Sequence, residues 1–312
     1  MLANKNCDRN VTHKDVLEAR SLLGGSVRTP LAVVEGILVK QENLQGTGVF
    51  KIRGVMNMLR HLNCKPRGLI TASTGNHGLC VAAVAKELGI PAVVVVPETI
   101  VTIKRSKIKG KGAEVVIHGY EYDEQEAMAK RLASERDFLY VPTADHPEII
   151  AGQGTCALEI MEEAQNVETI LAPVGNGGLI AGIGVAVKEG VNSSNNISVI
   201  GVQSECAPSM YASLSAGEIK TVVRSKTIAD GIAIRRPASL PFEVVRRLGL
   251  SVKLVSDGEI INAMAVLKRN GITAEPAGAV AFAEVLKDRD HYGPDTCAVI
   301  SGGNASSEMP TP

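Results

Sequence analysis

The sequence has 312 residues, of which 45% are hydrophobic and 21% are charged, and its 33 basic residues balance its 33 acidic ones. This length predicts one large domain or two closely packed domains of an ordinary globular protein. The balanced charge argues against a protein that binds nucleic acid or an anionic membrane, since both functions usually need a basic surface.

The predicted elements alternate between helices and strands along most of the chain. Hydrophobic spacing predicts a helix at 14–23, extended chain at 28–31 and a strand at 37–41. A first block follows, with a helix after Lys51, a strand at 68–72, a helix at 78–88, a strand at 91–96, a helix at 102–109, a strand at 113–117, a helix at 122–136 and a strand at 138–140. A second block gives a helix at 149–163, a strand at 169–174, a helix at 179–189, a strand at 198–203, a helix at 207–216 and a strand at 296–300. Such alternation is typical of parallel sheets with right-handed crossovers.

The two blocks predict an α/β protein of two parallel-sheet lobes with a cleft between them. We assign residues 1–57 and 148–312 to a large domain and residues 58–147 to a small, mobile domain. Because the sequence ends soon after the last predicted strand, we expect no appended regulatory domain and no response to isoleucine or valine.

The sequence shows no signal for export, for a membrane or for a metal. The stretch from Met1 to Lys14 is polar and lacks the apolar segment of a secretory signal, and apolar runs such as 91–97 are too short to span a bilayer. The histidines are dispersed, and no C-x-x-C pair occurs among Cys7, Cys64, Cys80, Cys156, Cys206 and Cys297. This usage is typical of reduced thiols in the cytoplasm, so we expect a cytoplasmic protein without a metal site.

Residues 46–54 form a predicted loop with glycine at both ends, and Lys51 within it lies at the start of a predicted helix. The helix is predicted because Ile52, Val55, Met56 and Leu59 recur at three- and four-residue intervals, while Arg53, Asn57 and Arg60 fall on the other side. The partial positive charge of a helix N-terminus disfavours an ammonium, and a deprotonated lysine is what a Schiff base requires. This stretch alone leaves open that Lys51 is a solvated residue of an amphipathic helix.

A second strand runs into small polar residues that open a helix, and these are Ser73, Thr74, Gly75, Asn76 and His77. Backbone N–H groups at such a junction converge on an anion, for which a substrate carboxylate is a natural candidate. The alternative is that Ser73 or Thr74 only caps the helix and that His77 is an ordinary packed histidine.

A third strand ends at the sequence Gly175, Asn176, Gly177, Gly178 and Leu179, which again begins a helix. Glycines let the backbone approach a phosphate closely, and the helix N-terminus supplies donors. The stretch lacks the G-x-G-x-x-G spacing of dinucleotide-binding proteins and the G-K-[ST] of a P-loop. A fourth strand ends at Ser301, which places a hydroxyl at the carboxyl edge of the sheet. Together the four stretches would suit pyridoxal 5'-phosphate carrying an amino acid.

Four motifs strengthen this interpretation, namely Phe50 to Gly54, Ser73 to Gly78, Thr227 to Gly231 and Glu275 to Ala279. With them the chain resembles the fold-type II pyridoxal-phosphate enzymes, and specifically the threonine/serine dehydratase and serine racemase family, over nearly its whole length. The resemblance implies a tryptophan synthase β-like fold with the cofactor in the cleft, and a homodimer. Cysteine synthases share the fold but usually carry Asn-Thr-Gly where this sequence has Asn76, His77 and Gly78.

The resemblance also implies roles for individual residues. Lys51 would attach to the cofactor and later remove the substrate's Cα proton, and Thr74 stands where racemases of the family carry a second acid/base hydroxyl. Residues 73–77 would hold the substrate. The cofactor would be bound by Phe50, Lys51, Asn76, Gly175, Asn176, Gly177, Gly178, Leu179 and Ser301. In this set Phe50 would lie against the ring, Asn76 would meet its hydroxyl and Ser301 its nitrogen.

Two positions depart from the family. Asn176 replaces one of four glycines in the phosphate-binding loop. Relatives that bind a divalent cation use an acidic residue matched here by Glu205 and a later aspartate, but Tyr211 stands at the aspartate position. We therefore expect no metal.

The resemblance implies an ammonia-lyase that converts L-threonine to 2-oxobutanoate and ammonia, and also L-serine to pyruvate. Three alternatives remain open, which are a serine racemase, a 3-hydroxyaspartate dehydratase and a non-catalytic carrier of pyridoxal phosphate. A carrier would have no need of the residues that are expected to hold a substrate.

Overall fold

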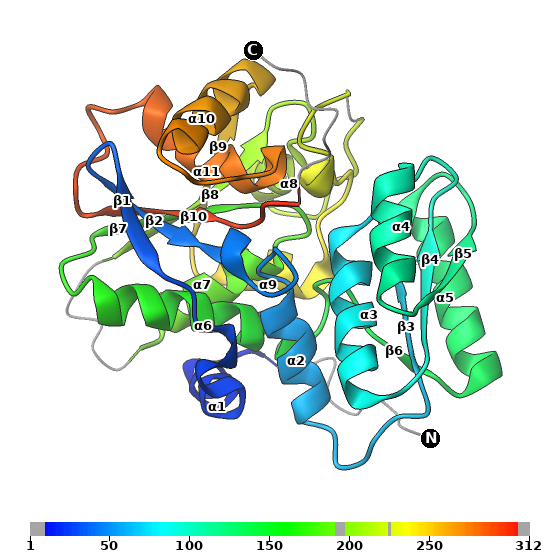
Figure 1. The fold of residues 1–312 in the computed structure, drawn as a ribbon. Helices are drawn as coiled ribbons and strands as arrows, with labels where there is room; N and C mark the ends of the chain where they lie inside the picture. Colours follow the sequence, from blue (N-terminus) through cyan, green and yellow to red (C-terminus); the bar gives the residue numbers. More distant parts are fainter. Residues whose placement is uncertain (1–9, 191–196, 224–225, 305–312) are drawn as a thin grey trace.

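The computed structural model describes residues 10–190, 197–223 and 226–304, and it contains two sheets (Figure 1). The larger sheet has the order β1 (Leu31–Val34), β2 (Ile37–Gln41), β10 (Thr296–Ile300), β7 (Thr169–Pro173), β8 (Ser198–Ser204) and β9 (Ser251–Val255). The smaller sheet has the order β5 (Glu114–Ile117), β4 (Ala92–Val96), β3 (Leu69–Ala72) and β6 (Leu139–Tyr140). The β1–β2 pair is antiparallel and the other pairs are parallel. The predicted α/β fold with two parallel-sheet regions is confirmed.

Helices cover both faces of the larger sheet. One face packs against α1 (His13–Leu23), α6 (Pro147–Glu163), α7 (Gly178–Lys188) and α9 (Ser239–Arg247). The other face packs against α10 (Asp257–Arg269) and α11 (Pro276–Lys287), which lie above the sheet in Figure 1. Because both faces are covered, strands such as β10 are apolar and buried along their whole length.

The smaller sheet is covered in the same way. On one side lie α2 (Ile52–Arg60), α3 (Asn76–Leu88) and α4 (Thr102–Gly110), and on the other lies α5 (Tyr122–Arg136). The remaining elements are α8 (Ser209–Ala216) and three short 3₁₀ turns, η1 (Gly24–Val27), η2 (Glu42–Leu44) and η3 (Asp230–Ile232). This sheet and its helices fall within the segment assigned to the small domain, except for α2, which begins before residue 58. The boundaries and the mobility of that domain stay predictions.

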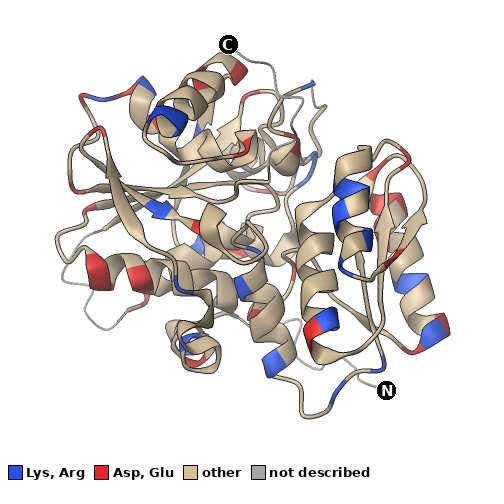
Figure 2. Ribbon diagram, viewed as in Figure 1, with Lys and Arg blue, Asp and Glu red and all other residues tan. Residues whose placement is uncertain are grey.

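The structure adds elements for which the sequence analysis gave no assignment. These are β1 and, between residues 217 and 295, η3, α9, β9, α10 and α11. The described residues contain no helix that is long and apolar enough to cross a membrane. Basic and acidic residues are interspersed over the view in Figure 2, as the balanced composition predicts.

Helix α2 is not amphipathic in the expected way, because Arg53 and Asn57 on its polar side are both fully buried. The Arg53 guanidinium forms paired bonds with Glu42, at 2.7 Å from Nε and Nη2, and with Glu159, at 2.6 Å from Nη1 and 2.9 Å from Nη2. Lys40 adds a 2.7 Å ion pair to Glu159. Buried charges of this kind need such partners, so the polar side of α2 is a second core contact rather than a surface.

Candidate active site

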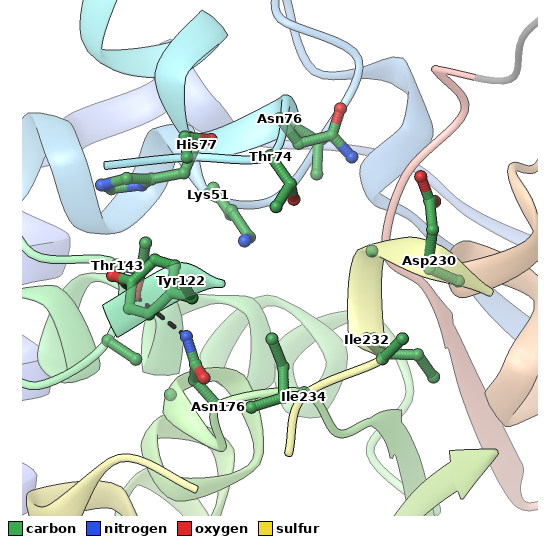
Figure 3. A pocket seen from close by; sticks show the side chains of 18 of the residues that line it. Lys51, Thr74, Asn76, His77, Tyr122, Thr143, Asn176, Asp230, Ile232 and Ile234 are labelled. Carbon is green, nitrogen blue, oxygen red and sulfur yellow. Dashed lines mark hydrogen bonds between the residues drawn. The ribbon is translucent and has the colours of Figure 1, made fainter. Parts of the chain in front are cut away.

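A pocket lies where strands of both sheets end. Its walls are the segments that follow β3, β4, β5 and β6 of the smaller sheet and β7 and β10 of the larger sheet. Parallel α/β sheets bind ligands outside the carboxyl ends of their strands. Figure 3 shows Lys51 pointing into this pocket, with Thr74 and Asn76 beside it and Asn176 across the open space. The four stretches that the sequence analysis selected therefore meet in one place.

Backbone hydrogen bonds fix the loop that carries Lys51 to the segment after β10. The Phe50 N–H donates to the Ser301 carbonyl at 3.0 Å, and the Gly303 N–H donates to the Gly48 carbonyl at 2.9 Å. Gly48 has φ +74°, and a Cβ there would lie 2.7 Å from Oδ1 of Asn304. Glycine is therefore required at this turn, and the two backbone bonds hold the loop that carries Lys51 against the segment that contains Ser301.

Lys51 precedes the first residue of α2, so the predicted position at a helix start is confirmed. Its pKa is lowered chiefly by burial, with a smaller lowering from Lys104 and opposing effects from Cys80 and Glu275. Burial disfavours the ammonium because the charged form loses its water. The sequence analysis attributed this effect to the helix N-terminus, but the largest cause is burial.

The loop of residues 73–77, which we call the carboxylate loop, joins β3 to α3. The Ser73 hydroxyl oxygen accepts bonds from the N–H groups of Gly75 at 3.0 Å and Gly78 at 2.9 Å. The Ser73 side chain therefore caps this turn, although the N-cap residue of α3 is Gly75, which has no side-chain cap bond. Ser73 also lines the pocket, so its predicted role toward a substrate stays a prediction. Thr74 is exposed to the pocket.

Asn76 is oriented by two partners. Its Nδ2 donates to Oε1 of Glu275 at 2.6 Å, and its Oδ1 accepts from Nδ2 of Asn304 at 3.1 Å. A carboxylate accepts hydrogen bonds, so this pairing defines which end of the amide is the donor. Asn76 also lines the pocket, so this oriented amide is part of the candidate site.

His77 is buried, and its Nε2 lies 3.2 Å from the Val141 carbonyl. Burial, together with the nearby Lys51, lowers the pKa of His77 to about 3. The imidazole is therefore neutral at physiological pH. His77 lines the pocket but contributes no charge to it.

The segment 175–179, which we call the phosphate loop, joins β7 to α7. The first N–H groups of a helix have no partner within the helix, so those of Gly178 and Leu179 remain available to an anion. Gly177 has φ +95°, and a Cβ there would lie 2.6 Å from Cε of Met210. A Cβ on Gly178 would lie 2.6 Å from Oε1 of Gln153. The ends of the Met210 and Gln153 side chains can move, but Cβ of Pro241 at 3.0 Å and Cβ of Ala144 at 3.1 Å also crowd the Cβ positions of Gly177 and Gly178, respectively.

The asparagine of the phosphate loop turns away from it. Nδ2 of Asn176 donates to the Thr143 hydroxyl at 2.9 Å, drawn as the dashed line in Figure 3. The Tyr122 hydroxyl lies 3.1 Å from the same Thr143 oxygen. Asn176 therefore ties the phosphate loop to Thr143 in the segment after β6, and through the Thr143 hydroxyl to Tyr122 at the start of α5.

Ser301 and Phe50 complete the wall around Lys51. Ser301 is 4% exposed and lines the pocket directly after β10. Phe50 is partly buried and packs against the cores of both the larger and the smaller sheet. The wall that faces Lys51 from β10 therefore offers a neutral hydroxyl and no charge.

Comparison with known proteins assigns the family. Residues 25–302 match the profile described as pyridoxal-phosphate dependent enzyme. The chain belongs to this family. An L-threonine ammonia-lyase of Thermotoga maritima is 41% identical over 311 residues, which cover 96% of this chain and 77% of that protein. A catabolic L-threonine dehydratase of Escherichia coli K12 is 39% identical, with 95% of this chain and 94% of that protein covered.

Solved structures of the family have the same fold. Maize serine racemase superposes with a TM-score of 0.90 at 30% identity and covers 96% of this chain and 95% of its own. The T.th. threonine deaminase superposes with a TM-score of 0.87 at 34% identity and covers 96% of this chain and 100% of its own. The family named in the sequence analysis is therefore confirmed, and with it the cofactor, pyridoxal 5'-phosphate.

The residues of the pocket fit this cofactor chemically. Lys51 supplies an amine whose pKa is lowered, the phosphate loop supplies N–H donors and a space that a Cβ would fill, and Asn76 supplies an amide donor. Ser301 supplies a hydroxyl for a ring nitrogen. The assignment of each residue to a part of the cofactor stays a prediction.

Sequence analysis missed several residues that line the pocket. Glu275 and Asp230 were quoted within motifs but given no role, and Tyr122, Thr143 and Lys104 were given no role either. For Glu275 and Asp230 the motif was a usable signal. The other three lie on loops and helices far apart in the sequence, and no local pattern marks them.

Glu205 and Tyr211 lie away from the pocket. Glu205 is exposed directly after β8, and its N–H donates to the Val255 carbonyl at 3.0 Å. Tyr211 is on α8 and 45% exposed. Within the described ranges, no group of three or more His, Cys, Asp or Glu side chains is placed to hold a metal ion.

Proposed function

We propose that this enzyme is a threonine/serine ammonia-lyase, which converts L-threonine to 2-oxobutanoate and ammonia and L-serine to pyruvate and ammonia. The observation that supports the proposal is that nearly the whole chain matches L-threonine ammonia-lyases and dehydratases at about 40% identity. One pocket also contains the amine of Lys51, the phosphate loop and the neutral hydroxyl of Ser301.

The proposed site follows the predicted assignments. Lys51 attaches to the cofactor, the phosphate loop holds its phosphate, Asn76 meets its ring hydroxyl, Ser301 meets its ring nitrogen and Phe50 lies beside the ring. Support comes from a backbone hydrogen bond that brings two of these residues together. The N–H of Phe50, which precedes Lys51, donates to the Ser301 carbonyl at 3.0 Å. The carboxylate loop is proposed to hold the substrate carboxylate through its N–H groups, as helix starts do for other anions.

Pyridoxal phosphate, when bound, withdraws electrons from the substrate's Cα and makes its proton acidic. Lys51 would act as the base toward the Cα proton, because burial lowers the pKa of its amine and so favours the neutral form that accepts a proton. Ser301 would form a hydrogen bond to the ring nitrogen but carries no charge, so it would not favour protonation of that nitrogen as an aspartate would. With a neutral partner the cofactor would withdraw electrons from Cα less strongly, which would favour loss of the substrate's β-hydroxyl.

Racemisation of serine is the second candidate, favoured by the position of Thr74 in the pocket and by the similarity to maize serine racemase. Inversion at Cα needs a proton donor on the face opposite Lys51. The β-branched side chain of threonine is stiff at χ1, which makes it a poorer proton shuttle than serine. We therefore expect dehydration to dominate.

The test is incubation of the holoenzyme with L-threonine, L-serine and 3-hydroxyaspartate, followed by a 2-oxo acid assay and chiral analysis of residual serine. We expect 2-oxobutanoate from L-threonine, and we expect Thr74→Ala to keep dehydration within about tenfold, a barrier change below about 1.4 kcal/mol. If D-serine accumulates faster than pyruvate and Thr74→Ala abolishes it, the enzyme is a racemase. If only 3-hydroxyaspartate is consumed, the proposed substrate is wrong.

We also propose a cytoplasmic homodimer in which residues 58–147 move as a unit. The thiols of Cys64, Cys80, Cys156, Cys206 and Cys297 are free, as expected in a reducing compartment. The smaller sheet has a hydrophobic cluster of its own between β3, β4 and α5, which supports independent movement. Analytical ultracentrifugation would measure the oligomeric state.

A further inference from the structure

An ion pair spans the pocket between two distant segments. Nζ of Lys104, on α4 beside the smaller sheet, contacts Oδ2 of Asp230, in the 3₁₀ turn η3 that packs against α11 of the larger sheet. Both residues line the pocket, and their side chains are 21% and 64% exposed. The pair therefore lies at the border between the pocket and solvent, where a ligand can compete for either partner.

The stem of Lys104 lies on the carboxylate loop. A Cβ on Gly75 would be 2.9 Å from Cδ of Lys104, so the aliphatic chain crosses directly over the backbone of that glycine. The ammonium beyond Cδ is thus held next to the loop whose N–H groups are proposed to receive the substrate carboxylate. Helix α4 is strongly basic, and Figure 2 shows blue bands along it; its basic residues are Lys104, Arg105, Lys107 and Lys109.

Lys104 is also available to bind the carboxylate of a substrate. Among the described residues that line the pocket, the basic ones other than histidine are Lys51 and Lys104. Lys51 is committed to the cofactor and to proton transfer. An amino-acid carboxylate that enters a partly desolvated pocket gains most from a charged donor, because charge-assisted hydrogen bonds are about twice as strong as neutral ones.

We propose that Lys104 binds the carboxylate of the amino-acid substrate, and that the Asp230 carboxylate occupies the same ammonium until the substrate arrives. The proposal rests on the proposed function, because it assigns a further binding residue to that site. The substrate replaces Asp230 on Lys104, so the ligand class selected is an α-amino carboxylate rather than a simple amine. Lys104 adds a charge to the backbone N–H groups of the carboxylate loop.

A purely structural role for the same ion pair makes a different prediction. If the pair only held the two segments together, Lys104→Met and Asp230→Asn would both weaken substrate binding. If Asp230 competes with the substrate, Lys104→Met weakens binding and Asp230→Asn strengthens it. The two variants therefore separate the two roles by the sign of their effects.

The experiment measures binding without turnover. L-Alanine lacks a β-leaving group, and ethylamine is the same molecule without its carboxylate. Binding of each to the holoenzyme is followed by the change in visible absorbance of the cofactor. Lys104→Met should weaken L-alanine about 10- to 100-fold, as expected for loss of one bond to a charged group, and should leave ethylamine within about twofold. Lys104→Arg should restore most of the loss, and Asp230→Asn should tighten L-alanine about two- to fivefold.

Lys107→Met is the matched control, because Lys107 is exposed on the same helix and does not line the pocket. It should change neither affinity. Equal losses for L-alanine and ethylamine in Lys104→Met, or weaker L-alanine binding in Asp230→Asn, would overturn the proposal. An enzyme that binds L-alanine through Lys104 but releases no 2-oxobutanoate from L-threonine would refute the proposed function and leave this inference intact.

Discussion

Gly177 provides the sharpest test of the phosphate loop. Its φ of +95° lies in the left-handed region, and a Cβ there would be 2.6 Å from Cε of Met210 and 3.0 Å from Cβ of Pro241. The methionine terminus can move aside, whereas the proline ring is part of the backbone of α9. A side chain at a left-handed φ costs about 1–2 kcal/mol. Gly177→Ala should therefore destabilise the loop conformation by at least this amount.

The expected effect on the cofactor follows from the same strain. Without phosphate the strained loop is free to relax, and the peptide between residues 177 and 178 then turns its N–H away from the phosphate position. Binding must restore the strained form, so affinity for pyridoxal phosphate falls by up to the strain energy. A loss of about 1–2 kcal/mol corresponds to roughly 5- to 30-fold weaker binding. The assay is titration of the cofactor-free protein with pyridoxal phosphate, followed by visible absorbance.

Gly217→Ala is the matched control for backbone strain. Gly217 ends α8 with φ +72°, a Cβ there would meet nothing within 4 Å, and it does not line the pocket. This variant should lose about the same stability toward denaturant but keep its affinity for the cofactor. If Gly177→Ala also bound pyridoxal phosphate within twofold of the unmodified protein, the loop would not hold the phosphate.

Three further variants test the remaining groups. Lys51→Ala should purify without the visible absorbance of a lysine-bound cofactor, and an adduct that borohydride still fixes to this variant would refute the assignment. Ser301→Asp should slow release of 2-oxobutanoate by about 10- to 100-fold, whereas an unchanged rate would show that charge on the ring nitrogen does not control the reaction. Burial raises the pKa of Glu275 in the folded protein above its ordinary value in the unfolded chain. Between these two pKa values the folded protein keeps a proton that the unfolded chain has lost. The stability of the folded protein therefore falls as pH rises through this range. Glu275→Gln should remove this decline in urea midpoints measured upward from about pH 4, and parallel profiles of the two proteins would contradict the reasoning.

Sequence reasoning located the site because its signals are local. Strand β4 is buried at every residue and reads as an unbroken β-branched run, which marks a strand covered on both faces. The carboxylate loop, the phosphate loop and Ser301 follow β3, β7 and β10, which are buried apart from the first residue of β7. The two loops contain the small residues that a helix start requires. The parallel arrangement then brings the loops to one edge, so their convergence could be predicted without any contact being known.

Some elements were missed although local signals exist. Helix α10 begins with a capping box in which the Ser256 side chain accepts from Glu259 N–H and Glu259 accepts from Ser256. Helix α11 has Pro276 in its first turn, a favoured position. Strand β9 alternates exposed and buried residues at Ser251, Val252 and Lys253, as an edge strand does. These patterns would have been sufficient to assign the chain between 217 and 295.

Other features had no local signal at all. Arg53 has the spacing of a surface residue, and only its partners Glu42 and Glu159, 11 and 106 positions away, explain its complete burial. The pairing of Lys104 with Asp230 joins residues 126 positions apart. Such pairs depend on how the two sheets meet, which hydrophobic periodicity does not encode.

The ion pairs of Arg53 with Glu42 and Glu159 also attach α2, and Lys51 with it, to the larger sheet. Shifting α2 away from the larger sheet would leave Glu42 buried without its Arg53 partner and Glu159 with Lys40 alone, and breaking a buried pair costs about 3–5 kcal/mol. Lys51 is therefore fixed to the larger sheet, by Arg53 on one side and by the backbone bond from Phe50 to Ser301 on the other. The carboxylate loop belongs instead to the smaller sheet, because it continues from β3 into α3. Any motion of the smaller sheet thus changes the distance from Lys51 to the substrate-binding groups while the lysine and Ser301 keep their relation. The ion pair between Lys104 and Asp230 joins the two parts of the site. If residues 58–147 move as proposed, a substrate that takes Lys104 from Asp230 would break this link between the moving and the fixed part.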